Sequence, residues 1–104
     1  MIAYKLIKQR KNGTLGPLFI EASRVVRVGV WEEARPVRKK GFAFRPGWHV
    51  CAEPKAPHLK MKPDRVWVRV EVGGEITEHQ RPESQGGLWY TCEKMKVKSL
   101  LPQP

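Results

Sequence analysis

The stretch Arg65-Val66-Trp67-Val68-Arg69-Val70-Glu71-Val72 decides the fold class of this chain. Valine takes every even position, while charged or aromatic residues take every odd position. Side chains alternate between the two faces of a β-strand, so this pattern gives one apolar face and one half-polar face. β-branched valine also favours strand over helix. We therefore predict a central strand over residues 65–72, ended by Gly73-Gly74.

Shorter strand candidates precede this stretch, separated by turn residues. Residues 2–8 are predicted to form a hairpin with residues 18–20, because Asn12-Gly13 suits a tight turn. Residues 24–31 are predicted to form a strand with its even-numbered valines on one face, and residues 32–40 are predicted to be a charged loop. Further candidates are residues 42–44 and 48–51, on either side of a Pro46-Gly47 turn with Gly47 at positive φ.

Two more candidates follow the central strand. Residues 75–79 form a short one, and residues 88–98 form the last strand, in which lysines alternate with Met95 and Val97. The parity of the apolar positions changes between Tyr90 and Met95. This change predicts a bulge or bend near Cys92.

Together these segments predict a mainly β fold. Six or seven short strands with little helix are typical of a small twisted antiparallel sheet, an open barrel or a sandwich. An α+β fold is the alternative, with one or two short helices at residues 20–26 or 55–61. The length of 104 residues suits one domain over residues 1–104, and residues 99–104 are predicted to be a flexible tail.

The chain is strongly basic, with 20 Lys and Arg against 10 Asp and Glu and a formal net charge of +10. Residues 1–52 carry 11 basic and 3 acidic side chains (+8), whereas residues 53–104 carry 9 and 7 (+2). A basic excess favours polyanionic partners and excludes an acidic mimic of DNA. Solubility alone also explains charges spread over a small surface.

Basic side chains interleaved with tryptophan predict a nucleic-acid interface. Aromatic rings stack on unpaired bases, and Lys or Arg follows the phosphate backbone. Trp67 lies between Arg65 and Arg69 on one strand face, and the lysines of the last strand extend this face if the two strands are neighbours. The alternative interpretation is that the tryptophans belong to the core and the lysines protect a sheet edge. The predicted contact residues are Arg35, Arg38, Lys39, Lys40, Arg65, Trp67, Arg69, Lys94, Lys96 and Lys98.

Two polar loops predict a ligand cleft as a competing site. Their side chains suit phosphate binding or proton transfer, so a small enzyme or phosphate-ligand-binding domain centred on His49, His58 and Glu83 is an alternative hypothesis. Turn chemistry also explains these residues. An ADP-ribosyltransferase-like site built on Tyr4, His49 and Glu83 lacks matching spacing, and no P-loop or GxGxxG motif is present. The predicted cleft residues are Arg45, Trp48, His49, His58, Arg81, Glu83, Ser84 and Gln85.

Cysteine and histidine raise the question of zinc or thiol chemistry. His49, Cys51, His58 and Cys92 are zinc-ligand types, but their spacing does not form paired CxxC motifs. A catalytic Cys–His pair needs a thiolate activated by a nearby base. Without a secretory signal, two free thiols are the default. We therefore predict no metal and no cofactor.

Three segments carry a resemblance to a known group of proteins. Gly41-Phe42-Ala43-Phe44-Arg45-Pro46-Gly47-Trp48-His49, Ala56-Pro57-His58-Leu59 and Arg81-Pro82-Glu83-Ser84-Gln85-Gly86-Gly87 resemble small uncharacterised proteins of bacteriophages and prophages, over about residues 3–100. The resemblance implies a phage accessory role and transfers no activity and no site residues.

We therefore expect a phage-type protein that acts by binding rather than catalysis. Nucleic acid (DNA or RNA) is the first expected partner, and a host protein, such as a defence factor that the chain inhibits, is the alternative. The sequence contains no secretory signal and no run of about 20 apolar residues. We therefore expect the cytoplasm, that of the host if a phage encodes the chain, and no membrane partner.

Overall fold

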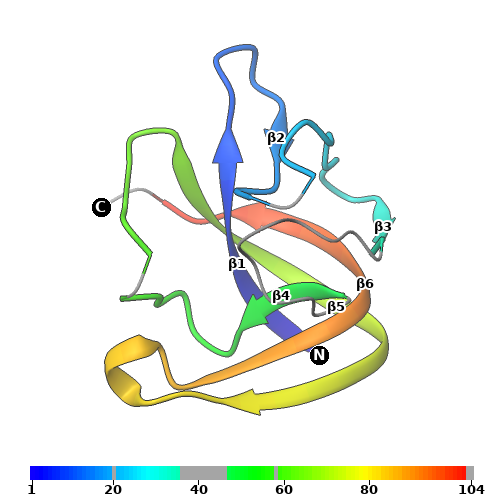
Figure 1. Ribbon diagram of the computed structural model, residues 1–104. Helices are drawn as coiled ribbons and strands as arrows, with labels where there is room; N and C mark the ends of the chain where they lie inside the picture. The colour runs from blue at the N-terminus through cyan, green and yellow to red at the C-terminus, as the bar shows by residue number, and fades with distance from the viewer. Residues whose placement is uncertain (20, 36–46, 58, 103–104) are drawn as a thin grey trace.

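The computed structural model describes residues 1–19, 21–35, 47–57 and 59–102. In these residues the fold is mainly β, as predicted, and one antiparallel sheet contains all six strands (Figure 1). The strands are β1 (Ile2–Gln9), β2 (Leu15–Gly16), β3 (Trp31–Glu33), β4 (Trp48–Cys51), β5 (Arg65–Gln80) and β6 (Leu88–Leu100). The described residues contain no α-helix, so the α+β alternative is wrong; a single 3-10 turn, η1 (Glu83–Gln85), joins β5 to β6.

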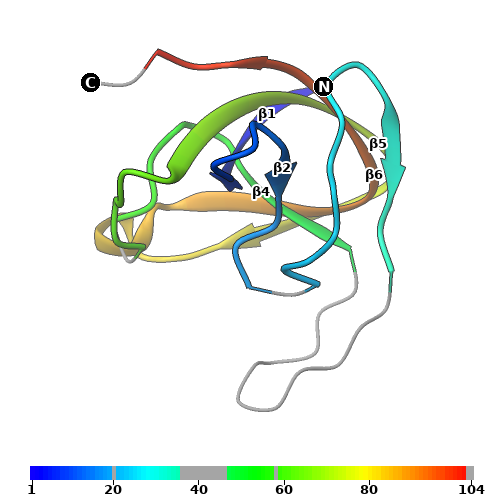
Figure 2. The same cartoon turned by 90° about the horizontal axis from the view of Figure 1, so that it is seen from above.

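Strand β6 organises the sheet because it pairs with β3, β4 and β5. Strand β1 pairs with β2 and with the first half of β5. β1 also meets β4 through one residue pair, Tyr4 with Cys51. The long, curved β5–β6 ribbon wraps around β1 and β4 (Figure 2). The result is a strongly curled sheet and not a closed barrel.

The core lies inside this curl and is built from the apolar face predicted for residues 65–72. Val66, Val68, Val70 and Val72 are at most 5% exposed. Met95 and Val97 of β6 are fully buried, while the lysines that alternate with them, Lys94, Lys96 and Lys98, face outward, as the alternation predicts. Burying a side chain of this kind stabilises a fold by about 1.5–3 kcal/mol.

Strand β5 is longer than predicted, because Gly73-Gly74 does not end it. The strand continues to Gln80 and includes the separate candidate at residues 75–79. Its pairing with β6 shifts between Gly73 and Ile76, so that Gly74 and Glu75 lie opposite Glu93 alone. This is a β-bulge, and Gly74 at φ +73° supplies the backbone shape that it requires.

The bulge confirms the predicted irregularity near Cys92, with the extra residue on β5 rather than on β6. Thr91 and Cys92 are both buried although they are neighbours in sequence. Cys92 is thus an additional buried position, because Trp89 and Thr91 before the bulge and Met95 and Val97 after it all occupy odd positions of β6.

The strand predicted over residues 24–31 is wrong. Isolated bridges form at Val26 and Val28, and only Trp31 of this segment lies in a strand. Strand β3 continues through Glu32 and Glu33, which were predicted to belong to the charged loop. Gly29 at φ +80° breaks the alternation, so Val28 and Val30 are 51% and 43% exposed while Val26 is buried.

The first hairpin forms, but its second strand comes earlier than predicted. Backbone hydrogen bonds close a turn between Arg10 and Thr14, so the chain returns at Leu15 instead of residue 18. Gly13 has the positive φ (+88°) expected of the turn, and Gly47 has the positive φ (+108°) predicted for the Pro-Gly turn. The guanidinium of Arg10 then binds three carbonyl oxygens, those of Leu15, Ala22 and Arg24.

The predicted tail overlaps the end of the sheet. Strand β6 continues through Leu100, and the backbone amide of Leu101 donates to Trp67 O at 2.8 Å. The candidate at residues 42–44 lies outside the described residues. No helix in the described part of the chain is long and apolar enough to cross a membrane.

Candidate nucleic-acid interface

Strand register brings two of the predicted basic groups together on the outward face of β5 and β6. Glu71 lies opposite Lys96, and Gly73 lies opposite Lys94. The odd-numbered side chains of β5 and the lysines of β6 therefore share one surface. We call this surface the basic face; it comprises Trp31, Arg65, Trp67, Arg69, Lys94, Lys96 and Lys98.

Trp31 belongs to this face, and sequence reasoning did not select it. It lies opposite Lys96 in the β3–β6 pair. The Nζ atoms of Lys94 and Lys96 lie 5.1 and 4.9 Å from the centroid of its indole ring. A Cβ atom on Gly73 would come within 3.2 Å of the indole Cζ3, so the ring reaches across β6 to the backbone of β5. Because Gly73 has no side chain, it leaves room for this ring. The glycine is visible in the sequence, but its role becomes apparent only from the pairing of β3 with β6.

The charges of the basic face are partly balanced. The Glu71 carboxylate lies 3.9 Å from the Nζ atoms of both Lys96 and Lys98. Arg65 donates to Lys60 O at 2.6 Å and lies over the Phe19 ring, so this side chain also holds the loop before β5. The exposed Arg69 and the lysines of β6 remain the main cations of this surface.

Arg35, the first residue of the predicted basic segment, does not join the basic face. Its guanidinium, 62% exposed, pairs with Glu21 at 3.2 Å. Arg38, Lys39 and Lys40 lie outside the described residues.

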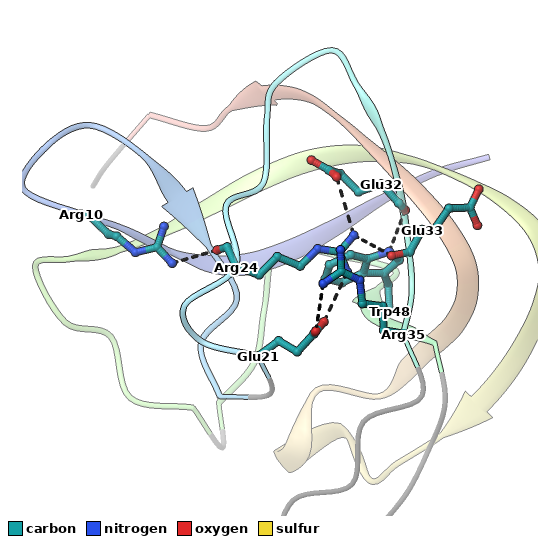
Figure 3. Close-up of polar contacts among 7 residues, drawn as sticks. All are labelled: Arg10, Glu21, Arg24, Glu32, Glu33, Arg35 and Trp48. Atoms are coloured by element: carbon teal, nitrogen blue, oxygen red, sulfur yellow. Dashed lines mark hydrogen bonds and ion pairs between the residues drawn. The ribbon is translucent and has the colours of Figure 1, made fainter.

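A neighbouring arginine, Arg24, fixes β3 and with it the position of Trp31 (Figure 3). Its side chain is only 10% exposed and pairs with Glu21 at 3.4 Å and with Glu32 at 3.6 Å. It also donates to Glu33 O at 2.6 Å and lies 4.7 Å from the Trp48 ring. The indole N–H of Trp48 donates to Glu32 O at 2.9 Å. Two carbonyl groups of β3 are therefore bound from the core side.

The predicted cleft residues do not gather in one place. Trp48 is 7% exposed and packs in the core. Glu83, Ser84 and Gln85 form the exposed turn η1, where the Gln85 amide donates to Pro82 O. Arg45 and His58 lie outside the described residues.

His49 and Arg81 do converge, on the buried ring of Trp89. The Arg81 guanidinium lies 4.1 Å from the Trp89 centroid, and the His49 ring lies 5.2 Å from it. His79 of β5, which sequence reasoning missed, stacks on the same indole at 4.3 Å and pairs with Thr91 Oγ1 at 3.0 Å. Trp89 is 5% exposed, so this cluster packs its rings against the sheet.

A cavity of about 380 Å³ lies elsewhere, beside the β5 bulge. Among the described residues, it shares none with the predicted cleft. Its lining is acidic and polar, formed by Glu33, Ala34, Arg35, Gly47, Glu75, Thr77, Thr91, Cys92 and Glu93.

The two thiols are free and protonated at neutral pH. Burial raises the pKa of Cys51, and it raises the pKa of Cys92 from 9.0 to about 11; the nearby Lys5 amine opposes both shifts. This environment does not favour the thiolate that a catalytic Cys–His pair requires. Within the described ranges, which omit His58, no three His, Cys, Asp or Glu side chains lie close enough to hold a metal ion.

Lys5 is the unusual amine of the structure. It projects from β1 to the core side of the sheet, where its Nζ donates to His49 O at 2.7 Å and lies 5.7 Å from the Trp48 ring. Burial lowers its pKa from 10.5 to about 8, and the neighbouring thiols oppose this shift.

No protein-family model, curated protein or solved structure matches this chain. The resemblance to phage and prophage proteins therefore stays a prediction from the quoted segments.

Proposed function

We propose that this protein binds nucleic acid through the basic face. One observation carries the proposal: strand pairing gathers Arg69, the three lysines of β6 and Trp31 on one outward surface. These residues come from the consecutive strands β5 and β6 and from β3, which is distant from both in sequence. Basic side chains that serve only solubility can be spread over the whole surface. A nucleic-acid backbone, in contrast, is bound by several cations that lie close enough together to contact successive phosphates.

The charge of this face sets a scale for its salt dependence. Each neutralised phosphate lowers the slope of log affinity against log salt by about 0.9 for a duplex and by about 0.7 for a single strand. Four cations in contact with phosphates therefore give a slope of about −3.6 for a duplex and about −2.8 for a single strand. Between 50 and 200 mM salt these slopes correspond to losses of roughly 150-fold and roughly 50-fold. The Glu71 carboxylate, which pairs with two of the lysines, reduces the attraction without removing it.

The test compares two double variants that remove equal charge. Arg69→Gln with Lys98→Gln changes the basic face, whereas Lys11→Gln with Lys55→Gln changes exposed loops outside it. Binding of a labelled 20-nucleotide strand and of the matching duplex is measured by fluorescence anisotropy at several salt concentrations, with nuclease-treated protein. We expect at least about a tenfold loss for the first variant and less than about threefold for the second.

Equal losses in the two variants would show that only net charge matters and would remove the basic face as the site. Absence of binding to both probes at 50 mM salt would overturn the proposal altogether.

A further inference from the structure

Resting on the proposed nucleic-acid function, we infer that the basic face takes single-stranded nucleic acid and that an unpaired base stacks on Trp31. All four tryptophans lie in the described residues, and they differ sharply in exposure. Trp48 and Trp89 are 7% and 5% exposed, and Trp67 is half-buried. Trp31 is 41% exposed. It is therefore the indole with the largest surface open to a ligand.

The Trp31 ring is held in place before any ligand arrives. Its Cζ3 edge lies close to the backbone of Gly73, and the backbone of Trp31 itself pairs with Lys96 of β6. The two following residues of β3 are bound by Trp48 and Arg24 through the carbonyl groups of Glu32 and Glu33. A pre-positioned ring loses little conformational freedom on binding, which favours affinity.

The two ammonium groups beside the ring suit the phosphates that flank a stacked base. The Nζ atoms of Lys94 and Lys96 lie 5.1 and 4.9 Å from the indole centroid. Both side chains are flexible, so each can turn from the ring to a phosphate while the base covers the indole. An aromatic ring with cations close to it is the arrangement that single-strand binding surfaces use.

The same geometry disfavours a duplex. Bases in a duplex stack on one another and leave no free face for an indole. A side chain that opens a base step must protrude as a wedge. The Trp31 ring instead reaches across the sheet to Gly73.

The test uses tryptophan fluorescence and affinity together. The probes are an unlabelled dT strand and rU strand of about 15 nucleotides for quenching, and the same strands and a duplex of equal length with a label for anisotropy. Trp31→Phe and Trp67→Phe form a matched pair on one face, and Trp31→Ala removes the ring. Urea unfolding of each variant establishes that it is folded.

We expect the wild type to bind single strands at least about tenfold more tightly than the duplex at the same salt concentration. Stacking quenches the indole, so quenching by dT should be largely lost in Trp31→Phe and retained in Trp67→Phe. Trp31→Ala should weaken single-strand binding about tenfold, and Trp31→Phe should restore most of this affinity.

Equal affinity for single strand and duplex would overturn the inference, as would full quenching in folded Trp31→Phe. In either case salt-dependent binding through the lysines would leave the proposed function standing. If neither strand nor duplex binds, the proposed function fails first. Similar results for dT and rU are expected, because stacking does not read the 2′-hydroxyl; a strong preference for rU would add a ribose contact to the base stack.

Discussion

Replacing Arg24 by alanine should destabilise the protein far more than replacing Arg35, although both arginines pair with Glu21. The Arg24 side chain is 10% exposed and that of Arg35 is 62% exposed. Arg24→Ala removes a charged hydrogen bond to Glu33 O, worth about 1.5–3 kcal/mol. It also removes the cation–π contact with Trp48, worth about 1 kcal/mol, and it leaves the Glu32 carboxylate, itself 13% exposed, without this cation.

These contributions are not additive, so we expect a loss of about 3 kcal/mol in the free energy of unfolding. For a domain of this size that corresponds to a fall of roughly 15 °C in Tm. The exposed Arg35 pair should contribute less than about 1 kcal/mol. Urea unfolding followed by tryptophan fluorescence measures both variants, and Arg24→Lys, which keeps the charge but loses the planar fork, should fall between them.

The reasoning is refuted if Arg24→Ala and Arg35→Ala cost the same within about 0.5 kcal/mol, a difference that unfolding measurements resolve for independent sites. Such a result would mean that the buried contacts of Arg24 contribute no more to the free energy of unfolding than the exposed pair of Arg35. The position of β3 would then depend on its pairing with β6 alone.

Three further predictions concern charge and titration. Glu71→Gln should raise nucleic-acid affinity about threefold at 50 mM salt by freeing two lysines, with the gain disappearing at 500 mM in anisotropy titrations, since exposed charges interact weakly at high ionic strength. The folded-state pKa of Lys5, about 8, lies below its unfolded value of 10.5, so the folded state binds fewer protons between these values. The free energy of unfolding of the wild type should therefore rise relative to that of Lys5→Met between pH 8 and pH 10.5, by up to about 3 kcal/mol. Below pH 8 the difference between the two proteins should be constant. Urea unfolding at several pH values measures both. At pH 8 a thiol reagent should modify Cys92 at least about tenfold more slowly in the folded than in the urea-unfolded protein, with the half-buried Cys51 reacting first; equal rates in both states would contradict the raised pKa values.

The parts of the fold that sequence reasoning predicted are those with a local period of two. The valines of residues 65–72 and the alternation of Met95 and Val97 with lysines each mark an apolar face without knowledge of any partner strand. The failure at Gly73-Gly74 has a non-local cause. Two glycines usually end a strand, but here Gly74 forms a bulge opposite Glu93, 19 positions later in the chain.

The errors around residues 24–31 and in the site have the same origin. The valine run has the composition of a strand, but Gly29 and the contacts of Arg24 hold it in an irregular path. Lys94, Lys96 and Lys98 were predicted as contact residues because they alternate along a single strand, β6. Trp31 was not predicted as a contact residue, because its position on the basic face depends on pairing with Lys96, 65 positions away.

The position of β6 at the centre of the pairing scheme has a consequence for how the protein acquires its structure. Strands β3 and β4 pair mainly with β6, a segment that the ribosome produces well after them, so this part of the sheet stays unformed until β6 emerges. Contacts between residues so far apart in sequence are associated with slow folding, in milliseconds to seconds. During this interval the valine-rich part of β5 can pair with β1, but its edge toward β6 stays unpaired. The basic side chains on its outward face oppose self-association through this edge by mutual repulsion. The positive charge through which we propose that the protein binds nucleic acid thus also protects the nascent chain.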